Sequence, residues 1–140
     1  MTEVFLDTAY LIALTTSSDT FHAKASQLAQ QLVARDVRLV TTRAVLLEVG
    51  NALSKQRCRS LGVRLLKEIG HNKSIEIVPL SESLYFKALS LFQDRMDKEW
   101  GLVDCVSFIV MKERGITQAL TCDQHFQQMG FQALLCENYL

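Results

Sequence analysis

The chain has no surplus of charge of either sign, because its 140 residues hold 15 Lys and Arg against 15 Asp and Glu. This balance excludes an overall basic field that would hold any polyanion by charge alone, so binding of nucleic acid needs a local basic patch or a metal ion. Glycine and proline are also scarce, with six and one residues. Because the chain has no repeat, low-complexity tract or linker-like break, we expect residues 1–140 to form a single domain.

A long apolar run and a basic leader are missing as well. The apolar stretch near the N-terminus is too short to span a bilayer, and Glu3 and Asp7 stand where a signal peptide would carry Lys or Arg. We therefore expect a cytoplasmic protein with no membrane partner. The cysteines form no C-x-x-C pair and lie mostly in apolar runs, which predicts reduced core thiols, with zinc ligation as the weaker alternative. They are Cys58, Cys105, Cys122 and Cys136.

Hydrophobic residues, by contrast, make up 49% of the chain and alternate between strand-like and helix-like patterns. Apolar runs typical of buried strands lie at residues 4–6, 38–41, 75–80 and 118–121, with a weaker one at 131–135. Helical periodicity occurs at residues 21–35, 43–53, 81–92 and 102–111, with Ser81 as an expected N-cap. This alternation predicts an α/β fold in which a parallel sheet is flanked by helices on both faces.

Two aspartates follow strands of the predicted sheet. Asp7 closes the first strand and Asp123 follows the fourth. Ligands of such sheets bind outside the carboxyl ends of the strands, so both positions are candidates for a functional site. Each residue also precedes helical sequence, where Asp is a favoured N-cap, and capping is the simplest alternative for either one taken alone.

Asp104 lies in the first turn of a helix that is apolar almost all round, so we expect its side chain to be buried. The helix dipole stabilises a carboxylate at this position by only ~0.3–1 kcal/mol, whereas burying an unpaired carboxylate costs several kcal/mol. Capping is not expected to account for this residue, and a strong partner is implied.

Glu48 shares its helical face with small and polar residues, which leaves room for a ligand; an ordinary surface glutamate is the alternative. If all four acids converged at ~6 Å, in an effective dielectric of ~20, each pair would repel by ~3 kcal/mol and the set by on the order of 15 kcal/mol. That approaches the whole ~5–15 kcal/mol stability of a domain. Such a cluster needs protons or a hard divalent cation, and oxygen ligands favour Mg²⁺ or Mn²⁺.

Four segments of the chain, taken together, resemble the PIN-domain family, and especially the VapC-type ribonuclease toxins and their standalone relatives. The segments are VFLDTAYLIAL, VLLEVGNAL, GLVDCVSFIVMKERGI and ALTCDQHFQQMGF. The resemblance covers essentially the whole chain and implies a metal-dependent endoribonuclease, the toxin of a type II toxin–antitoxin pair, acting on RNA. It implies that Asp7, Glu48, Asp104 and Asp123 are catalytic and hold Mg²⁺ or Mn²⁺. It also implies a homodimer and a small antitoxin protein as partner.

Two positions depart from the pattern of many of these relatives. Ala9 stands where a hydroxyl or amide is common two residues after the first Asp, which removes a secondary polar contact. Phe108 and Val110 stand where small residues are common after the third acid, and we expect them to repack the core. Neither change removes a metal ligand that the resemblance implies.

Other residues have two interpretations each. Thr8, Asn51 and Thr121 could support the acids or the phosphate, or could simply stabilise helix starts and surfaces. The densest basic run, residues 54–67, could contact RNA phosphates or form a solvated helix face. Its leading candidates for RNA contact are Lys55, Arg57 and Arg59.

Aromatic and imidazole side chains near the acids are weaker candidates. Trp100 could offer a stacking surface for a base, although a lone Trp is more often a core residue. His22 and His125 are not expected to take part in catalysis, since a His two residues after a capping Asp usually faces solvent or the helix end. A catalytically silent PIN-like module that binds RNA or protein is the alternative function.

Overall fold

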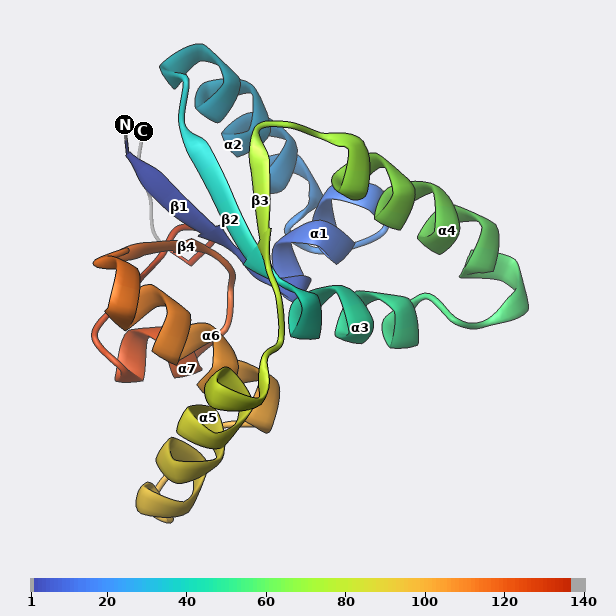
Figure 1. The fold of residues 1–140 in the computed structure, drawn as a ribbon. Helices are drawn as coiled ribbons and strands as arrows, with labels where there is room; N and C mark the ends of the chain where they lie inside the picture. Colours follow the sequence, from blue (N-terminus) through green and yellow to red (C-terminus); the bar gives the residue numbers. More distant parts are fainter. Residues whose placement is uncertain (1, 137–140) are drawn as a thin grey trace.

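Five parallel strands form the centre of the computed structural model, which describes residues 2–136 (Figure 1). The strands are β1 (Glu3–Leu6), β2 (Arg38–Thr42), β3 (Ile75–Val78), β4 (Gln118–Leu120) and β5 (Gln132–Ala133), in the order β3-β2-β1-β4-β5. The helices are α1 (Thr8–Thr15), α2 (His22–Arg35), α3 (Arg43–Ala52), α4 (Gln56–His71), α5 (Glu82–Asp94), α6 (Leu102–Arg114) and α7 (Gln124–Gln128). The predicted α/β fold is confirmed.

The strand order reverses at β1. Phe5 of β1 is paired with Val40 of β2 on one side and with Ala119 of β4 on the other. The chain therefore leaves β1 towards β2 and β3, and later returns to the opposite side of β1 as β4. The carboxyl ends of β1 and β4 are adjacent at this reversal, which is the usual position of a ligand in an open parallel sheet.

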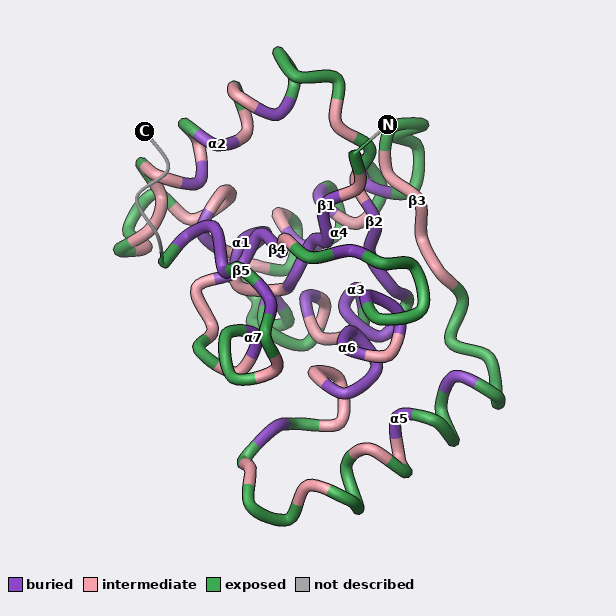
Figure 2. The backbone as a smooth tube through the Cα atoms, turned by 90° about the vertical axis from the view of Figure 1, so that its left-hand side faces the viewer, coloured by how far each residue is buried: buried purple, intermediate pink, exposed green. Residues whose placement is uncertain are grey.

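Helices cover both faces of the sheet, as the alternation of patterns predicts. On one face α1, α2 and α4 surround an apolar cavity of about 430 Å³, and Leu6, Leu39 and Ile75 of the strands line its floor. On the other face α6 and α7 pack together, and α5 packs mainly on α6. Figure 2 shows that buried residues are concentrated in the central strands and in α6, whereas much of α5 is exposed.

An aromatic cluster joins α6 and α7 to the sheet. The Phe108 ring meets Phe126 edge-on at a centroid distance of 5.0 Å and Trp100 edge-on at 5.1 Å. Phe126 in turn lies 6.3 Å from Phe5 of β1. Each such ring pair contributes about 0.5–1.5 kcal/mol beyond the burial of its area. Phe108 is therefore a fully buried core residue.

Trp100 is a core residue. Its side chain is buried, and its Nε1 donates a hydrogen bond to Gln128 Oε1 at 2.9 Å. The hypothesis that Trp100 offers a stacking surface for an RNA base is wrong, because the indole is 4% exposed and is contacted by the Phe108 ring and by the Arg95 guanidinium, which lies 5.0 Å over it.

Several element boundaries differ from the expectations. The strand predicted at residues 75–80 ends at Val78, because Pro79 has no N–H to continue the ladder. The weak strand predicted at 131–135 is reduced to Gln132–Ala133. Ser81 caps α5 as predicted, accepting a hydrogen bond from Leu84 N at 3.1 Å. α6 continues three residues beyond the predicted 102–111 and ends at Gly115, whose φ of 68° suits a glycine C-cap.

The four cysteines are thiols, but only some of them lie in the core. Cys105 is buried, Cys58 and Cys122 are partly buried, and Cys136 is exposed, so the expectation of a core thiol is wrong for Cys136. The group of side chains that could hold a metal ion within residues 2–136 includes none of them, which leaves the zinc alternative without support. Over the same residues, no helix has both the length and the apolar content needed to span a membrane.

Candidate metal centre

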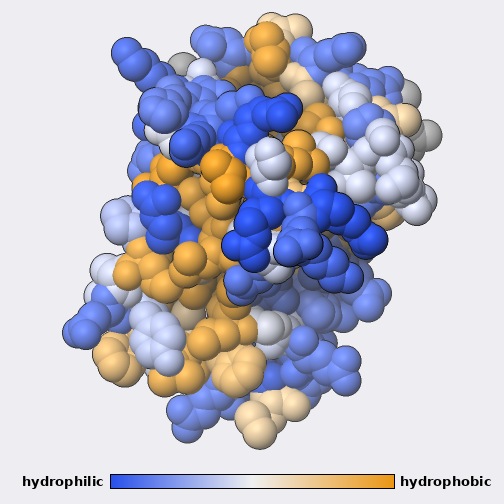
Figure 3. All heavy atoms as spheres, turned by 90° about the vertical axis from the view of Figure 1, so that its right-hand side faces the viewer, coloured by the Kyte–Doolittle hydropathy of each residue, from blue (hydrophilic) through white to orange (hydrophobic). Residues whose placement is uncertain are grey.

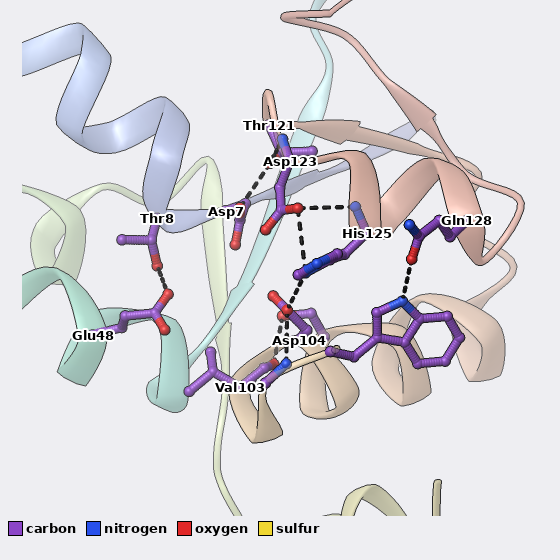
Figure 4. Close-up of polar contacts among 12 residues, drawn as sticks. Asp7, Thr8, Glu48, Val103, Asp104, Thr121, Asp123, His125 and Gln128 are labelled. Carbon is purple, nitrogen blue, oxygen red and sulfur yellow. Dashed lines mark hydrogen bonds and ion pairs between the residues drawn. The ribbon is translucent and has the colours of Figure 1, made fainter. Parts of the chain in front are cut away.

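Four acidic side chains lie near the carboxyl ends of β1 and β4. The ligand atoms that lie within 4.8 Å of one another belong to Asp104, Asp123 and His125, and this close group does not include Asp7 or Glu48. Asp7 connects β1 to α1, Glu48 lies on α3, Asp104 lies on α6, and Asp123 precedes α7. Figure 4 shows their carboxylates directed towards one space between these elements. The four carboxylates differ in how deeply they are buried and in which groups donate hydrogen bonds to them.

Asp7 is the most deeply buried of the four, with 5% of its surface exposed. The pKa of its carboxyl is raised from 3.8 to about 7, chiefly by burial and to a smaller extent by the nearby charges of Asp104 and Glu48. Hydrogen bonds act in the opposite direction, chiefly one from Thr121 Oγ1 to Asp7 Oδ2 at 2.8 Å. Asp7 occupies the N-cap position of α1, but its side chain makes no capping hydrogen bond there. The capping alternative is therefore wrong for Asp7.

Asp123 and Asp7 are linked through the buried hydroxyl of Thr121. Asp123 N donates to Thr121 Oγ1 at 3.0 Å, and that hydroxyl donates its own hydrogen to Asp7. Asp123 also caps α7, because its Oδ1 accepts a hydrogen bond from His125 N at 2.9 Å. The capping alternative is thus correct for Asp123, and capping does not turn its carboxylate away from the site (Figure 4).

Asp104 has a capping role that the sequence argument excluded. Its Oδ2 accepts a hydrogen bond at 3.1 Å from the backbone N–H of Gly101, the N-cap of α6. The expectation that capping does not account for this residue is therefore wrong. The implied strong partner does exist: His125 Nδ1 lies 3.0 Å from Asp104 Oδ2. Burial raises the pKa of the Asp104 carboxyl, and the hydrogen bonds from His125 and Gly101 partly offset that effect.

Glu48 is held at the edge of the group by Thr8, whose Oγ1 donates a hydrogen bond to Glu48 Oε1. Its helix is fixed at the start by Thr42, which accepts a hydrogen bond from Val45 N at 3.1 Å. The predicted apolar stripe is buried and fixes the rotation of α3. The stripe consists of Val45, Leu46, Val49 and Leu53. Asn51 is exposed and, with Glu48, lines a small cavity of about 230 Å³ beside the acids.

Within the described residues, the acids are not paired with a lysine or an arginine. Among residues 2–136, no Lys or Arg forms an ion pair with any of the four; the only ion-pair contacts are those of His125 with Asp104 and Asp123. A buried carboxylate such as Asp7, held only by neutral donors among other acids, is costly unless it is protonated or neutralised by a cation. Several carboxylate oxygens in one space are the donors that a hard divalent cation prefers, so these residues fit such an ion.

Comparison with known proteins identifies the family of the chain. The family model described as PIN domain matches residues 4–132. The chain belongs to the PIN domain family. The 23S rRNA-specific endonuclease VapC20 of Mycobacterium tuberculosis is 26% identical to this PIN domain over 128 residues, which cover 91% of this chain and 95% of VapC20.

Two solved structures resemble this PIN domain. The crystal structure of M. tuberculosis VapC20, described as a sarcin–ricin loop cleaving toxin, matches with a TM-score of 0.80 and 25% identity over 91% of this chain and 95% of that one. VapBC2 from Rickettsia felis, crystallised with a DNA fragment from its promoter, matches with a TM-score of 0.66 over 94% and 96% of the two chains. At 15% identity, the second likeness shows the fold alone.

His125 of this PIN domain was not predicted to be a residue of the site. His125 was expected to face solvent or the helix end, but its Nδ1 lies 3.0 Å from Asp104 Oδ2 and 3.4 Å from Asp123 Oδ1. The D-x-H spacing places the ring on the first turn of α7, next to Asp123. No sequence signal reveals the contact with Asp104, because that residue lies 21 positions earlier on another helix.

The candidate RNA-binding residues of this PIN domain differ in whether their charged groups are free to contact a phosphate. Lys55 and Arg57 are exposed at the start of α4, just beyond the end of the helix that carries Glu48. The guanidinium of Arg59 donates two hydrogen bonds to the backbone oxygen of Ser54, from Nε at 3.0 Å and Nη2 at 2.7 Å. Arg59 therefore stabilises the turn between α3 and α4, and Lys55 and Arg57 are the better candidates for phosphate contact.

Proposed function

We propose that this PIN domain is a metal-dependent endoribonuclease that hydrolyses RNA phosphodiesters in the cytoplasm. The observation that carries the proposal is the group of Asp7, Glu48, Asp104 and Asp123 at the carboxyl ends of β1 and β4, with no Lys or Arg of residues 2–136 paired to it. The similarity to VapC20, named as an endonuclease specific for 23S rRNA, supports RNA as the substrate class.

In this proposal the four acids hold Mg²⁺ or Mn²⁺. The bound ion supplies an activated water and neutralises charge on the scissile phosphate. Thr121 orients Asp7 by donating to one carboxylate oxygen, and Thr8 orients Glu48 in the same way. Glu48, which is partly buried beside the small cavity, would orient the attacking water or hold a second ion. Hydrolysis with in-line attack leaves a 3′-hydroxyl and a 5′-phosphate.

The proposed biological role is that of the toxin of a type II toxin–antitoxin pair. An antitoxin protein would silence the enzyme by placing a basic side chain among the acids, which lack such a partner within residues 2–136. A homodimer would cover part of an apolar band that crosses the face drawn in Figure 3 and reaches the lower end, where α5 lies. Exposed apolar residues of α5 include Tyr85, Phe86 and Phe92, and exposed Leu47 and Leu80 line the small cavity together with Tyr85.

Metal binding should stabilise the folded protein. We expect millimolar Mg²⁺ or Mn²⁺ to raise the melting temperature by several degrees, because an ion at a hundred times its Kd adds about 2.7 kcal/mol to the free energy of unfolding. EDTA should reverse the shift and abolish cleavage of a mixed RNA sample. Differential scanning calorimetry and gel analysis of the same preparation measure the two effects.

The control for this experiment is KCl at matched ionic strength, since general screening also reduces repulsion among acids. An equal shift with KCl, or no shift with either divalent ion, would contradict a metal centre. Metal binding without cleavage of any RNA would instead favour the catalytically silent module.

Removal of the exposed positive charges should weaken RNA binding without altering the acids. We expect the double variant Lys55→Ala/Arg57→Ala to reduce the slope of log K against log salt concentration by about 1.4, which corresponds to two lost phosphate contacts with single-stranded RNA. Binding is measured by fluorescence anisotropy with Mg²⁺ present, in an Asp104→Asn background that spares the RNA.

The matched control is Arg35→Ala/Lys73→Ala. It removes the same charge from exposed positions that precede β2 and β3, at the end of the sheet opposite the acids. If both double variants change the salt slope equally, Lys55 and Arg57 form only a solvated helix face.

A further inference from the structure

The imidazole of His125 lies between two of the four acids. Its Nδ1 is 3.0 Å from Asp104 Oδ2 and 3.4 Å from Asp123 Oδ1. One ligand atom from each of these three residues lies within 4.8 Å of the other two. We propose that His125 is a nitrogen ligand of the catalytic ion, and that it shifts the ion preference of this site from Mg²⁺ towards Mn²⁺. The inference rests on the proposed metal-dependent function and adds a ligand to it.

The two distances from Nδ1 to the carboxylate oxygens are compatible with three ligands around one ion. Two atoms bound at ~2.1 Å are about 3.0 Å apart when they subtend a right angle and about 3.4 Å apart at a tetrahedral angle. The two contacts of Nδ1 match these separations. Two flanking carboxylate oxygens require a hydrogen on Nδ1; an ion would take the place of that hydrogen, and the ring would then carry its hydrogen on Nε2.

The three side chains are held in place before any ion arrives. The backbone N–H of His125 donates to Asp123 Oδ1 at 2.9 Å, and Gly101 N donates to Asp104 Oδ2 at 3.1 Å. The side chains of His125, Asp104 and Asp123 are 24%, 16% and 33% exposed, so an ion can reach them from solvent. Figure 4 shows the ring of His125 directed into the space shared by the carboxylates.

A nitrogen donor changes which ions the site favours. Mg²⁺ prefers an all-oxygen shell, whereas imidazole is a better ligand for transition-metal ions. An all-carboxylate site would therefore discriminate less between Mg²⁺ and Mn²⁺ than a site that includes His125. A role limited to orienting Asp104 and Asp123 by hydrogen bonding would leave the ion without a nitrogen ligand.

Pulsed electron paramagnetic resonance of the Mn²⁺-loaded protein separates these roles. We expect ¹⁴N modulation from a bound imidazole in the parent, its loss in His125→Gln, and its persistence in His71→Gln, an exposed histidine at the end of α4. Calorimetric titration should show that the ratio Kd(Mg²⁺)/Kd(Mn²⁺) falls about tenfold in His125→Gln only.

A measurement on the parent alone covers the case in which His125→Gln does not fold. Growth with ¹⁵N-histidine should replace the ¹⁴N modulation by the ¹⁵N pattern, and the chain has only three histidines. Mn²⁺ bound without any nitrogen signal would overturn this assignment and leave the four-acid site intact. If the protein binds no Mn²⁺ at all, the proposed function fails together with the assignment.

Discussion

Replacing Asp104 by Asn is expected to lower RNA cleavage by on the order of 10²- to 10³-fold, because the site loses charge that an ion needs at the scissile phosphate. The same change should leave the metal-free protein at least as stable as the parent. The amide oxygen of Asn can still accept the hydrogen bonds from Gly101 N and His125 Nδ1, and repulsion among the remaining acids falls. Melting temperature and RNA cleavage measured on one preparation test both expectations.

Asp94→Asn is the matched control, since it removes the same charge from an exposed position at the end of α5. It should change neither quantity. If Asp104 serves only as a structural partner of His125, the Asn variant would instead be destabilised by about 3–5 kcal/mol. An unstable variant whose folded fraction cleaves RNA at the parental rate contradicts the proposed site.

The metal-free protein is expected to lose stability as the pH rises from about 4 to about 7, and Asp7→Asn should remove this loss. Burial raises the pKa of the Asp7 carboxyl from 3.8 to about 7, so the folded state holds a proton that the unfolded state has already released. Between these values the folded state binds more protons, and its free energy of unfolding therefore falls with rising pH. The full loss is on the order of 4 kcal/mol and is complete above pH 7.

The difference between parent and variant isolates Asp7, because the other titrating groups are shared. Urea unfolding in EDTA at several pH values should show Asp7→Asn gaining stability relative to the parent up to pH 7 and no more beyond it. With saturating Mn²⁺ the order should reverse, since the parent alone keeps its full set of ligands. A constant difference between the two proteins across pH 4–8 would show that Asp7 is not held protonated.

Much of the fold can be predicted from the sequence because it depends on local patterns. The apolar runs at residues 4–6 and 38–41, and the serine that caps α5, identify their elements without tertiary information. The end of β3 could also have been predicted, because Pro79 cannot donate to the ladder. Once β1 and β4 are known to be neighbours, Asp7 and Asp123 are expected to lie close together, because the carboxyl ends of parallel strands lie at one edge of the sheet.

The site was less predictable where it depends on contacts between distant helices. The partner of Asp104 is a histidine on α7, and the partner of Glu48 is a threonine on α1, which lies 40 positions away. Sequence spacing gives no measure of either distance. The capping role of Asp104 was not predicted for another reason. The helix dipole alone stabilises its carboxylate only weakly, but the N–H of Gly101 also donates a direct hydrogen bond to it.

The aromatic cluster under α6 and α7 also affects the positions of two acids of the candidate metal centre. Asp104 lies one turn before Phe108 on α6, and Asp123 lies three residues before Phe126 on α7, while the two rings meet edge-on. The contact between these two rings therefore helps to fix the separation of α6 and α7, and with it the separation of the two acids. A bulky ring at position 108 therefore positions two acids of the candidate metal centre as well as stabilising the core.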